Sequence, residues 1–173
     1  YSKLGLTIDV PYKLLDMAND AVGLMDGLNI EKAHIIGASM GGMIAQIIAA
    51  HYPQRTLSLT SIMSSSGRRS LPGPSLKILL QMSKHSASNE DAYLDNAMKL
   101  WALIGSPDYL PPPEELRERI RTSYRRSFYP TGYIRQGAAI FASGDRVELL
   151  KQITAPTLII HGRADVLVPE MCG

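Results

Sequence analysis

The sequence predicts an α/β protein with parallel strands, because strand-like and helix-like segments alternate along it. Short runs of apolar and branched residues, typical of strands, occupy 33–36, 56–62 and 157–161. Apolar residues recur at helical spacing over 12–28 and again in the stretch that follows Ser39. Strands that alternate with helices favour a parallel sheet built by right-handed crossovers, with helices packed on its faces.

Turn-forming residues mark the ends of these segments. Asn29 stands just past the first helical stretch, where a left-handed residue commonly ends a helix. Pro53 follows the second helical stretch and cannot continue it. Pro156 precedes the third strand, which is a position that proline tolerates.

The middle of the chain lacks strand patterns. A serine-rich loop at 64–70 opens it, and a short helix at 146–152 follows it. We therefore assign residues 1–66 and 146–173 to a partial α/β core and residues 67–145 to an all-helical cap. The helices expected in the cap are 75–83, 89–104, 113–127 and 131–142.

Composition excludes several classes of function. The chain has 173 residues with 18 Lys and Arg against 16 Asp and Glu, and this near balance argues against a nucleic-acid partner. Hydrophobic residues make up 45% and no apolar run is long enough to span a bilayer, so we expect a soluble domain without a membrane partner. No export signal opens the chain, and the single cysteine, Cys172, suits a reducing compartment, so we expect a cytoplasmic protein.

The strongest functional signal is Gly37-Ala38-Ser39-Met40-Gly41, which matches G-x-S-x-G. A buried strand leads into it and a helix leads out, which is the arrangement of a nucleophile elbow. Gly37 and Gly41 are expected to leave room for the tight turn, and Gly42 to help the helix approach. Ser39 then becomes a candidate nucleophile, and the N–H of Met40 a candidate oxyanion donor at the start of a helix. The alternative is a glycine-rich turn with an idle serine.

Asp165 follows the third strand by four residues and is the candidate acid. Catalytic groups of open parallel sheets gather at the carboxyl ends of the strands, where Ser39 is also expected. A carboxylate there can orient a histidine and stabilise its charged form. The alternative is an aspartate that only forms a turn. No cluster has the spacing of metal ligands, and the chemistry needs no cofactor.

Two stretches, Ile30–Gly67 and Ala155–Pro169, resemble the α/β-hydrolase family. The first is similar to the strand, nucleophile elbow and next strand of that family, and the second to its acid-bearing strand and loop. Within the family the sequence is most similar to small-ester hydrolases of the aclacinomycin methylesterase-like group. The resemblance implies Ser39 as nucleophile, Asp165 as triad acid, the Met40 N–H as oxyanion donor and a small-molecule ester as substrate.

The same resemblance implies that parts of the family fold are missing at both ends. The triad order of this fold is Ser, acid, His, yet no histidine follows Asp165. The histidines that are present sit poorly for a base, and we expect packing or surface roles for them: His34, His51, His85 and His161. We therefore expect a fragment that is inactive or nearly so by itself.

Two further expectations follow from that reading. A sheet with both edges bare should pair with another chain, so we expect a homodimer or an aggregate. A non-catalytic binding or assembly module on the same scaffold is the alternative to an enzyme. Perhydrolase, lactonase or C–C bond hydrolysis remain open as reactions, because the same triad serves them.

Overall fold

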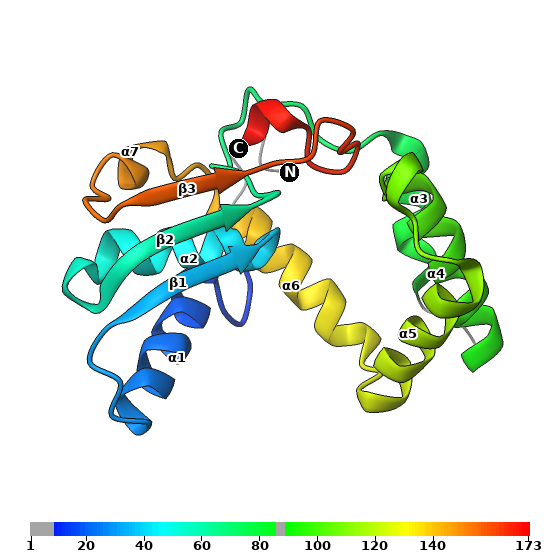
Figure 1. The fold of residues 1–173 in the computed structure, drawn as a ribbon, viewed down its shortest axis with the longest axis horizontal. Helices are drawn as coiled ribbons and strands as arrows, with labels where there is room; N and C mark the ends of the chain where they lie inside the picture. Colours follow the sequence, from blue (N-terminus) through cyan, green and yellow to red (C-terminus); the bar gives the residue numbers. More distant parts are fainter. Residues whose placement is uncertain (1–8, 86–88) are drawn as a thin grey trace.

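A three-stranded parallel sheet forms the centre of the fold (Figure 1). The computed structural model describes residues 9–85 and 89–173. The strands β1 (Ala33–Ala38), β2 (Thr56–Ile62) and β3 (Thr157–Ile160) lie side by side in that order, with both pairs parallel. The parallel α/β core predicted from the sequence is confirmed.

One face of the sheet is covered by helices. Helix α2 (Met40–His51) packs on it, with Ala45 and Ala49 against Leu59 of β2. These small side chains let the helix approach the strands closely. Helices α1 (Leu14–Gly27) and α7 (Val147–Leu150) flank α2 on the same side (Figure 1).

The largest apolar cluster joins α1 to α2. Leu14, Ala18 and Val22 lie one turn apart on α1 and pack against Met43 and Ile47 of α2. Full burial of a side chain the size of Leu14 stabilises a fold by about 1.5–3 kcal/mol. Helix α1 ends as the sequence predicts, because Asn29 just beyond it has a positive φ of 55°.

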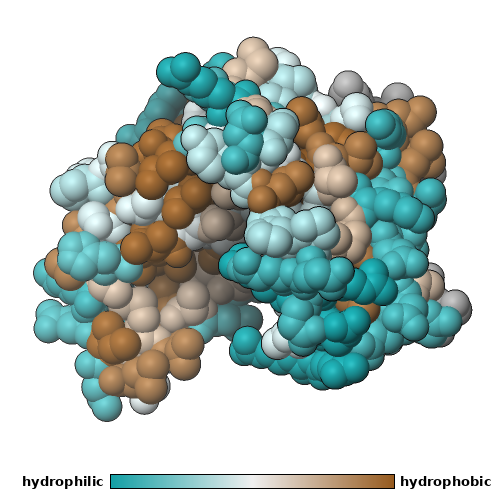
Figure 2. All heavy atoms as spheres, turned by 45° about the vertical axis from the view of Figure 1, so that its right-hand side comes forward, coloured by the Kyte–Doolittle hydropathy of each residue, from teal (hydrophilic) through white to brown (hydrophobic). Residues whose placement is uncertain are grey.

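The opposite face of the sheet is apolar and exposed. Ile36 of β1 is 67% exposed, and every residue of β3 is exposed, including Leu158 and Ile159. Hydrophobic side chains gather on the side of the molecule that carries the sheet (Figure 2). Within residues 9–85 and 89–173 no helix covers this face, whereas the alternation of strands and helices had predicted helices on both faces.

Three helices stand apart from the sheet at the other end of the molecule (Figure 1). They are α3 (Leu76–Met82), α4 (Glu90–Ile104) and α5 (Pro113–Arg126). Leu94 and Ala97 of α4 pack against Leu116 and Ile120 of α5 and form a small core of their own. We call α3, α4 and α5 together the cap helices.

Helix α6 (Pro130–Ser143) connects the cap helices to the core (Figure 1). At its last residue the hydroxyl of Ser143 accepts a hydrogen bond of 3.0 Å from the N–H of Leu14, the first residue of α1. Ala139 is fully buried and Ile140 packs against the α1–α2 cluster. The second half of α6, which the sequence assigns to the cap, therefore packs on the core.

Four short 3₁₀ segments complete the described structure: Pro53–Arg55, Ser83–His85, Pro107–Tyr109 and Glu170–Cys172. Among the helices that the structure describes, none combines the length and apolar character needed to cross a membrane.

Candidate active site

The backbone of Ser39 is strained at the junction of β1 and α2. Its φ is 53° and its ψ is −119°, a conformation that side chains other than glycine rarely adopt. Such a residue costs about 1–3 kcal/mol and persists only where its surroundings hold it. Here the N–H of Ser39 donates to the carbonyl of Ile62 at 2.8 Å. Its own carbonyl accepts from the N–H groups of Gly42 at 3.0 Å and Met43 at 3.2 Å.

Two glycines make this junction sterically possible. A Cβ on Gly37 would collide with the backbone carbonyl of Gly41, and a Cβ on Gly42 would lie 2.6 Å from the Cβ of Ser64. A Cβ on Gly41 would meet no atom within 4 Å. The space requirement therefore lies at Gly37 and at Gly42, where the sequence suggested a close approach of the helix, and not at Gly41.

Met40 is the first residue of α2. The first N–H groups of a helix have no acceptor within the helix and lie at the positive end of its dipole. The N–H of Met40 is thus available next to Ser39, which is itself half-buried. This is the place where an oxyanion donor would be needed if the Ser39 hydroxyl attacked a carbonyl carbon.

Asp165 lies in the loop after β3, beyond the carboxyl end of the strand. Ser39 follows the carboxyl end of β1, and all three strands are parallel, so both residues lie at the same edge of the sheet. The Oδ1 atom of Asp165 accepts hydrogen bonds from the N–H groups of Leu167 at 2.9 Å and Val168 at 2.8 Å. These hydrogen bonds stabilise a turn, which is the alternative role that the sequence allows for Asp165. They also fix the orientation of its carboxylate.

His161 supports that loop from below. Its side chain is 5% exposed, and its Nε2 lies 2.7 Å from the carbonyl of Val168 and 3.7 Å from Oδ2 of Asp165. The carbonyl can only accept, so Nε2 carries the proton and donates it. The Nδ1 atom is buried and has no hydrogen-bond partner among the described residues. Because His161 is buried and engaged with its own loop, it cannot serve as a base for Ser39.

His34 and His51 are also remote from this chemistry. His34 is exposed on β1 with its Nδ1 2.8 Å from the hydroxyl of Ser58, and His51 ends α2 at the far end from Ser39. The side chain of His85 lies outside the described residues. None of the histidine side chains that the structure describes is therefore placed as the base for Ser39.

Cys172 offers no second nucleophile at this edge. The thiol is buried, and its pKa is raised by desolvation and by the nearby negative charge of Asp165. A raised pKa keeps the sulfur protonated, whereas the thiolate is the reactive form. In the part of the chain that the structure describes, no group of His, Cys, Asp and Glu side chains is arranged to hold a metal ion.

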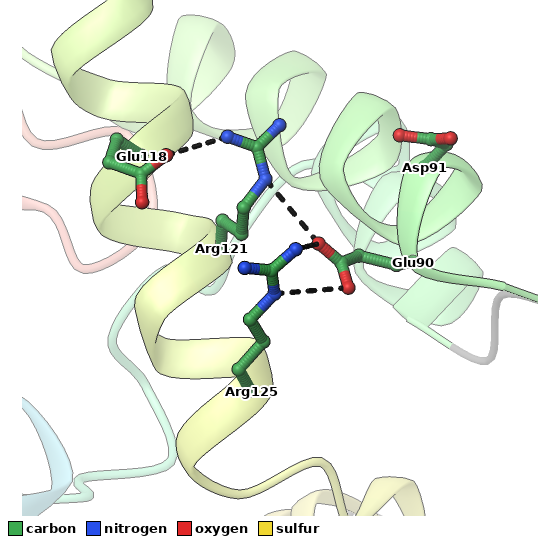
Figure 3. Close-up of a pocket in the computed structure, with 5 residues that line it drawn as sticks. All are labelled: Glu90, Asp91, Glu118, Arg121 and Arg125. Atoms are coloured by element: carbon green, nitrogen blue, oxygen red, sulfur yellow. Dashed lines mark hydrogen bonds and ion pairs between the residues drawn. The ribbon is translucent and has the colours of Figure 1, made fainter.

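A shallow pocket of about 500 Å³ lies between α4 and α5, far from Ser39 in the fold. Figure 3 shows Arg121 and Arg125 of α5 turned toward Glu90 of α4. The Oε1 atom of Glu90 lies 3.4 Å from Arg121 Nε and 3.1 Å from an Arg125 terminal nitrogen. The Oε2 atom of Glu118 lies 2.6 Å from a terminal nitrogen of Arg121. These arginines pair with carboxylates, so we interpret the pocket as an ion-pair network that joins two helices.

A comparison with protein families decides the fold family. The model of the alpha/beta hydrolase fold matches residues 7–172, nearly the whole chain. The chain belongs to the α/β hydrolase fold family. The resemblance seen in Ile30–Gly67 and Ala155–Pro169 is therefore confirmed, and so is the three-stranded sheet as part of an α/β-hydrolase core.

Individual α/β hydrolases differ in reaction. A 2-hydroxy-6-oxononadienedioate/2-hydroxy-6-oxononatrienedioate hydrolase of Pseudomonas sp is 31% identical, over 90% of this chain and 54% of its own length. A rhodomycin D methylesterase of Streptomyces peucetius is 24% identical, over 92% of this chain and 60% of its own. The solved structure of a meta-cleavage product hydrolase from Pseudomonas fluorescens IP01 superposes with a TM-score of 0.70 at 24% identity, over 95% of this chain and 58% of that one. This last likeness shows the fold alone.

The chain thus spans little more than half the length of these α/β hydrolases. The relatives include both an esterase and a hydrolase of dienedioates. Family membership therefore does not select a substrate.

Sequence reasoning missed two residues that support the elbow. Ser64 is buried beneath Ser39, and Arg146 is 4% exposed beside the loop that carries Ser64. The serine-rich run after β2 predicts only a loop, although its position at the carboxyl edge of the sheet points to the same edge as Ser39. Arg146 carried no local signal, because its partners lie far away in the sequence.

Proposed function

We propose that this chain carries the nucleophile and the acid of a serine hydrolase that acts on small carboxylic esters. Ser39 is the nucleophile, Asp165 the acid and the N–H of Met40 one oxyanion donor. The observation that carries the proposal is the strained backbone of Ser39, with φ 53° and ψ −119°, between a strand and a helix. Strain of this kind at a non-glycine residue is concentrated at functional sites.

The reaction is acyl transfer. A histidine base removes the proton of the Ser39 hydroxyl while the oxygen attacks the ester carbonyl carbon, and the carbonyl oxygen becomes an anion facing the Met40 N–H. The C–O bond to the alcohol then breaks, and the alcohol leaves with the proton from the histidine. Water, activated by the same base, hydrolyses the acyl-Ser39 ester. Asp165 orients the histidine and stabilises its charged form.

The base is the part of this triad that the sequence does not supply. No histidine follows Asp165, where the Ser, acid, His order of the fold requires it. Removal of one triad member lowers kcat by several orders of magnitude. The polypeptide of residues 1–173 is therefore expected to hydrolyse esters slowly or not at all by itself.

A fluorophosphonate probe tests the proposal. The chain is labelled as it stands and after extension with the segment that follows the acid loop in a relative of the family. We expect strong labelling only of the extended chain, and its loss in Ser39→Ala. Ser65→Ala is the matched control, because it removes a hydroxyl at the same edge of the sheet and should leave the labelling intact. An extended chain that binds no probe, although it folds, overturns the hydrolase assignment.

A non-catalytic binding or assembly module on the same scaffold is the alternative class. The same probe experiment distinguishes the two, since a binding module has no activated serine in either chain. Among hydrolytic reactions, lactone and C–C bond hydrolysis would also proceed through Ser39. They are separated by assaying an ester, a lactone and a dienedioate side by side.

We infer further that the chain associates with itself through the sheet. The exposed apolar residues of β3, among them Leu158 and Ile160, lie on the outermost strand. An uncovered edge strand with apolar side chains favours pairing with another chain. Light scattering should therefore give a mass above 18.9 kDa, and a monodisperse monomer contradicts this inference.

A further inference from the structure

Ser64 lies two residues after the end of β2 and next to the junction of β1 and α2. The residue before it, Met63, has a positive φ of 42°, an uncommon conformation for a side chain of this size. The N–H of Met63 donates to the carbonyl of Ile160 at 2.8 Å, so the turn is anchored to β3. This bend brings Ser64 back toward β1 and leaves it 2% exposed.

The Ser64 hydroxyl contacts Ser39 directly. It donates a hydrogen bond of 2.8 Å to the Ser39 carbonyl, the same oxygen that accepts from the N–H groups of Gly42 and Met43. The Ser64 side chain also fills the space that a Cβ on Gly42 would need. Residues with a positive φ therefore follow two neighbouring strands, Ser39 after β1 and Met63 after β2. The hydrogen bond from the Ser64 hydroxyl connects these two turns.

The segment that carries Ser64 is itself held by a buried guanidinium. The guanidinium of Arg146 donates to the carbonyl of Ser65 at 2.6 Å and to that of Gly144 at 3.1 Å. The backbone N–H of Arg146 donates to the carbonyl of Ser66 at 3.0 Å. Burial lowers the pKa of this arginine, although the guanidinium remains charged because its ordinary value is so high. The chain leaving the core after β2 and the chain returning after α6 are thus tied together at Arg146.

We propose that Ser64 is a positioning residue for the nucleophile Ser39. Its hydroxyl holds the Ser39 carbonyl, and this fixes the backbone angles that direct the Ser39 side chain. The proposal rests on the proposed function for its catalytic consequence, but the positioning itself is a property of the folded chain. Small displacements of a reacting group are costly, since a shift of about 1 Å can lower a rate about a hundredfold.

The test compares Ser64→Ala with Ser61→Ala in the isotope-labelled chain of 173 residues. Ser61 is the matched control, because it lies on β2 three residues before Ser64 and is 5% exposed, and because its hydroxyl accepts a hydrogen bond of 3.3 Å from Gln46 of α2. In a triple-resonance spectrum the Met40 amide reports the carbonyl carbon of Ser39. We expect that resonance to move upfield in Ser64→Ala only. Amide exchange at Gly42 and Met43 should accelerate about fivefold to tenfold in the same variant.

The second readout is the rate of fluorophosphonate labelling in the extended chain. Ser64→Ala should slow the labelling of Ser39 about tenfold, whereas Ser61→Ala should leave it unchanged even if both variants lose the same thermal stability. If the two variants behave alike in the spectrum, or if the Ser39 carbonyl moves without slowing the labelling, the positioning role is overturned. Failure of the unsubstituted extended chain to label overturns the proposed function instead, and the spectrum still decides whether Ser64 holds the elbow.

Discussion

The core and the cap helices are held together by different forces. In the core, α2 lies so close to the strands that glycine and alanine are required at the contact, and the α1–α2 cluster is almost fully buried. In the cap, α4 and α5 share a small cluster around Leu94 and a ring contact between Tyr93 and Tyr124, with centroids 5.0 Å apart. Arginine–carboxylate pairs join the exposed sides of the two helices. Close packing fixes positions to a fraction of an ångström, whereas exposed ion pairs tolerate movement.

This difference bears on the function that we propose. The junction at Ser39 depends on close backbone contacts, so the proposed nucleophile lies in the closely packed part. The cap can change its surface residues and ion pairs without disturbing the elbow. The contrast leads to four predictions, from the largest expected effect to the smallest.

The largest effect is expected for Gly37→Ala. The new methyl group would collide with the backbone carbonyl of Gly41, which cannot move without breaking the start of α2. We expect a loss of at least about 3 kcal/mol in the free energy of unfolding, measured by urea denaturation. Gly41→Ala is the control: its methyl group meets open space, and alanine in a helix should stabilise by up to about 1 kcal/mol. Equal stability of the two variants would contradict the close approach at the elbow.

Cavity variants should separate the two regions. Leu94→Ala removes a fully buried side chain from the cap, and Leu59→Ala removes a 2% exposed one from the core. Each should cost about 2–5 kcal/mol in its own region. Trp101 of α4 is the only tryptophan, so its fluorescence reports the cap, and amide exchange of β1 and β2 reports the core. We expect Leu94→Ala to shift the first signal and Leu59→Ala the second. One coincident transition in both variants would mean that the regions unfold as a unit.

The ion pairs should give a smaller, salt-dependent effect. Glu90→Gln removes the carboxylate that Arg121 and Arg125 share, and we expect a loss of about 0.5–1 kcal/mol in the cap transition. The difference should shrink at about 1 M salt, where the screening length falls to about 3 Å. Glu148→Gln, which breaks the exposed pair with Lys151 in α7, should leave the Trp101 transition unchanged. A loss that persists undiminished at high salt would show that packing rather than charge is responsible.

The smallest effect is expected at alkaline pH. Burial raises the pKa values of Tyr93 and Tyr133, so the folded protein keeps protons that the unfolded chain has already lost. The contribution is complete below about pH 10, the ordinary tyrosine value, and decreases as the pH rises above it. Tyr133→Phe should flatten this decline in the Trp101 transition, whereas Tyr109→Phe, at an 86% exposed ring, should not. A decline that is unchanged in Tyr133→Phe would assign it to other groups.

The sequence predicted the elements that depend on local patterns. The parallel strands, the strand-to-helix turn at Ser39 and the left-handed end of α1 at Asn29 all follow from periodicity and single residues, and the structure has them. The prediction for β1 stopped at Ile36, whereas the strand continues to Ala38, because Gly37 and Ala38 pair with Ser61 and Ile62 of β2. This pairing involves a distant segment of the chain, so the local pattern of apolar residues does not predict it.

The support around the site could not be predicted, since it consists of contacts between distant segments. Ser64 meets Ser39 across 25 positions, and Arg146 meets Ser65 across 81. The sequence suggested that Gly42 helps the helix approach, but not that the close neighbour is Ser64. The rule that functional groups gather at the carboxyl ends of parallel strands predicts the position of Asp165. The two hydrogen bonds that its carboxylate accepts from backbone N–H groups depend on the conformation of its own loop.

Helix α6 is a rigid connection between the core and the cap helices. Its 14 residues make a stiff rod about 21 Å long, attached at one end to α1 through Ser143 and leading at the other to the cap helices. A tilt of about 10° at the attachment carries the far end about 4 Å, roughly the width of a methylene chain. The position of the cap helices relative to the core therefore depends on the angle at which the second half of α6 packs on α1 and α2, through Ala139, Ile140 and the Ser143 hydroxyl.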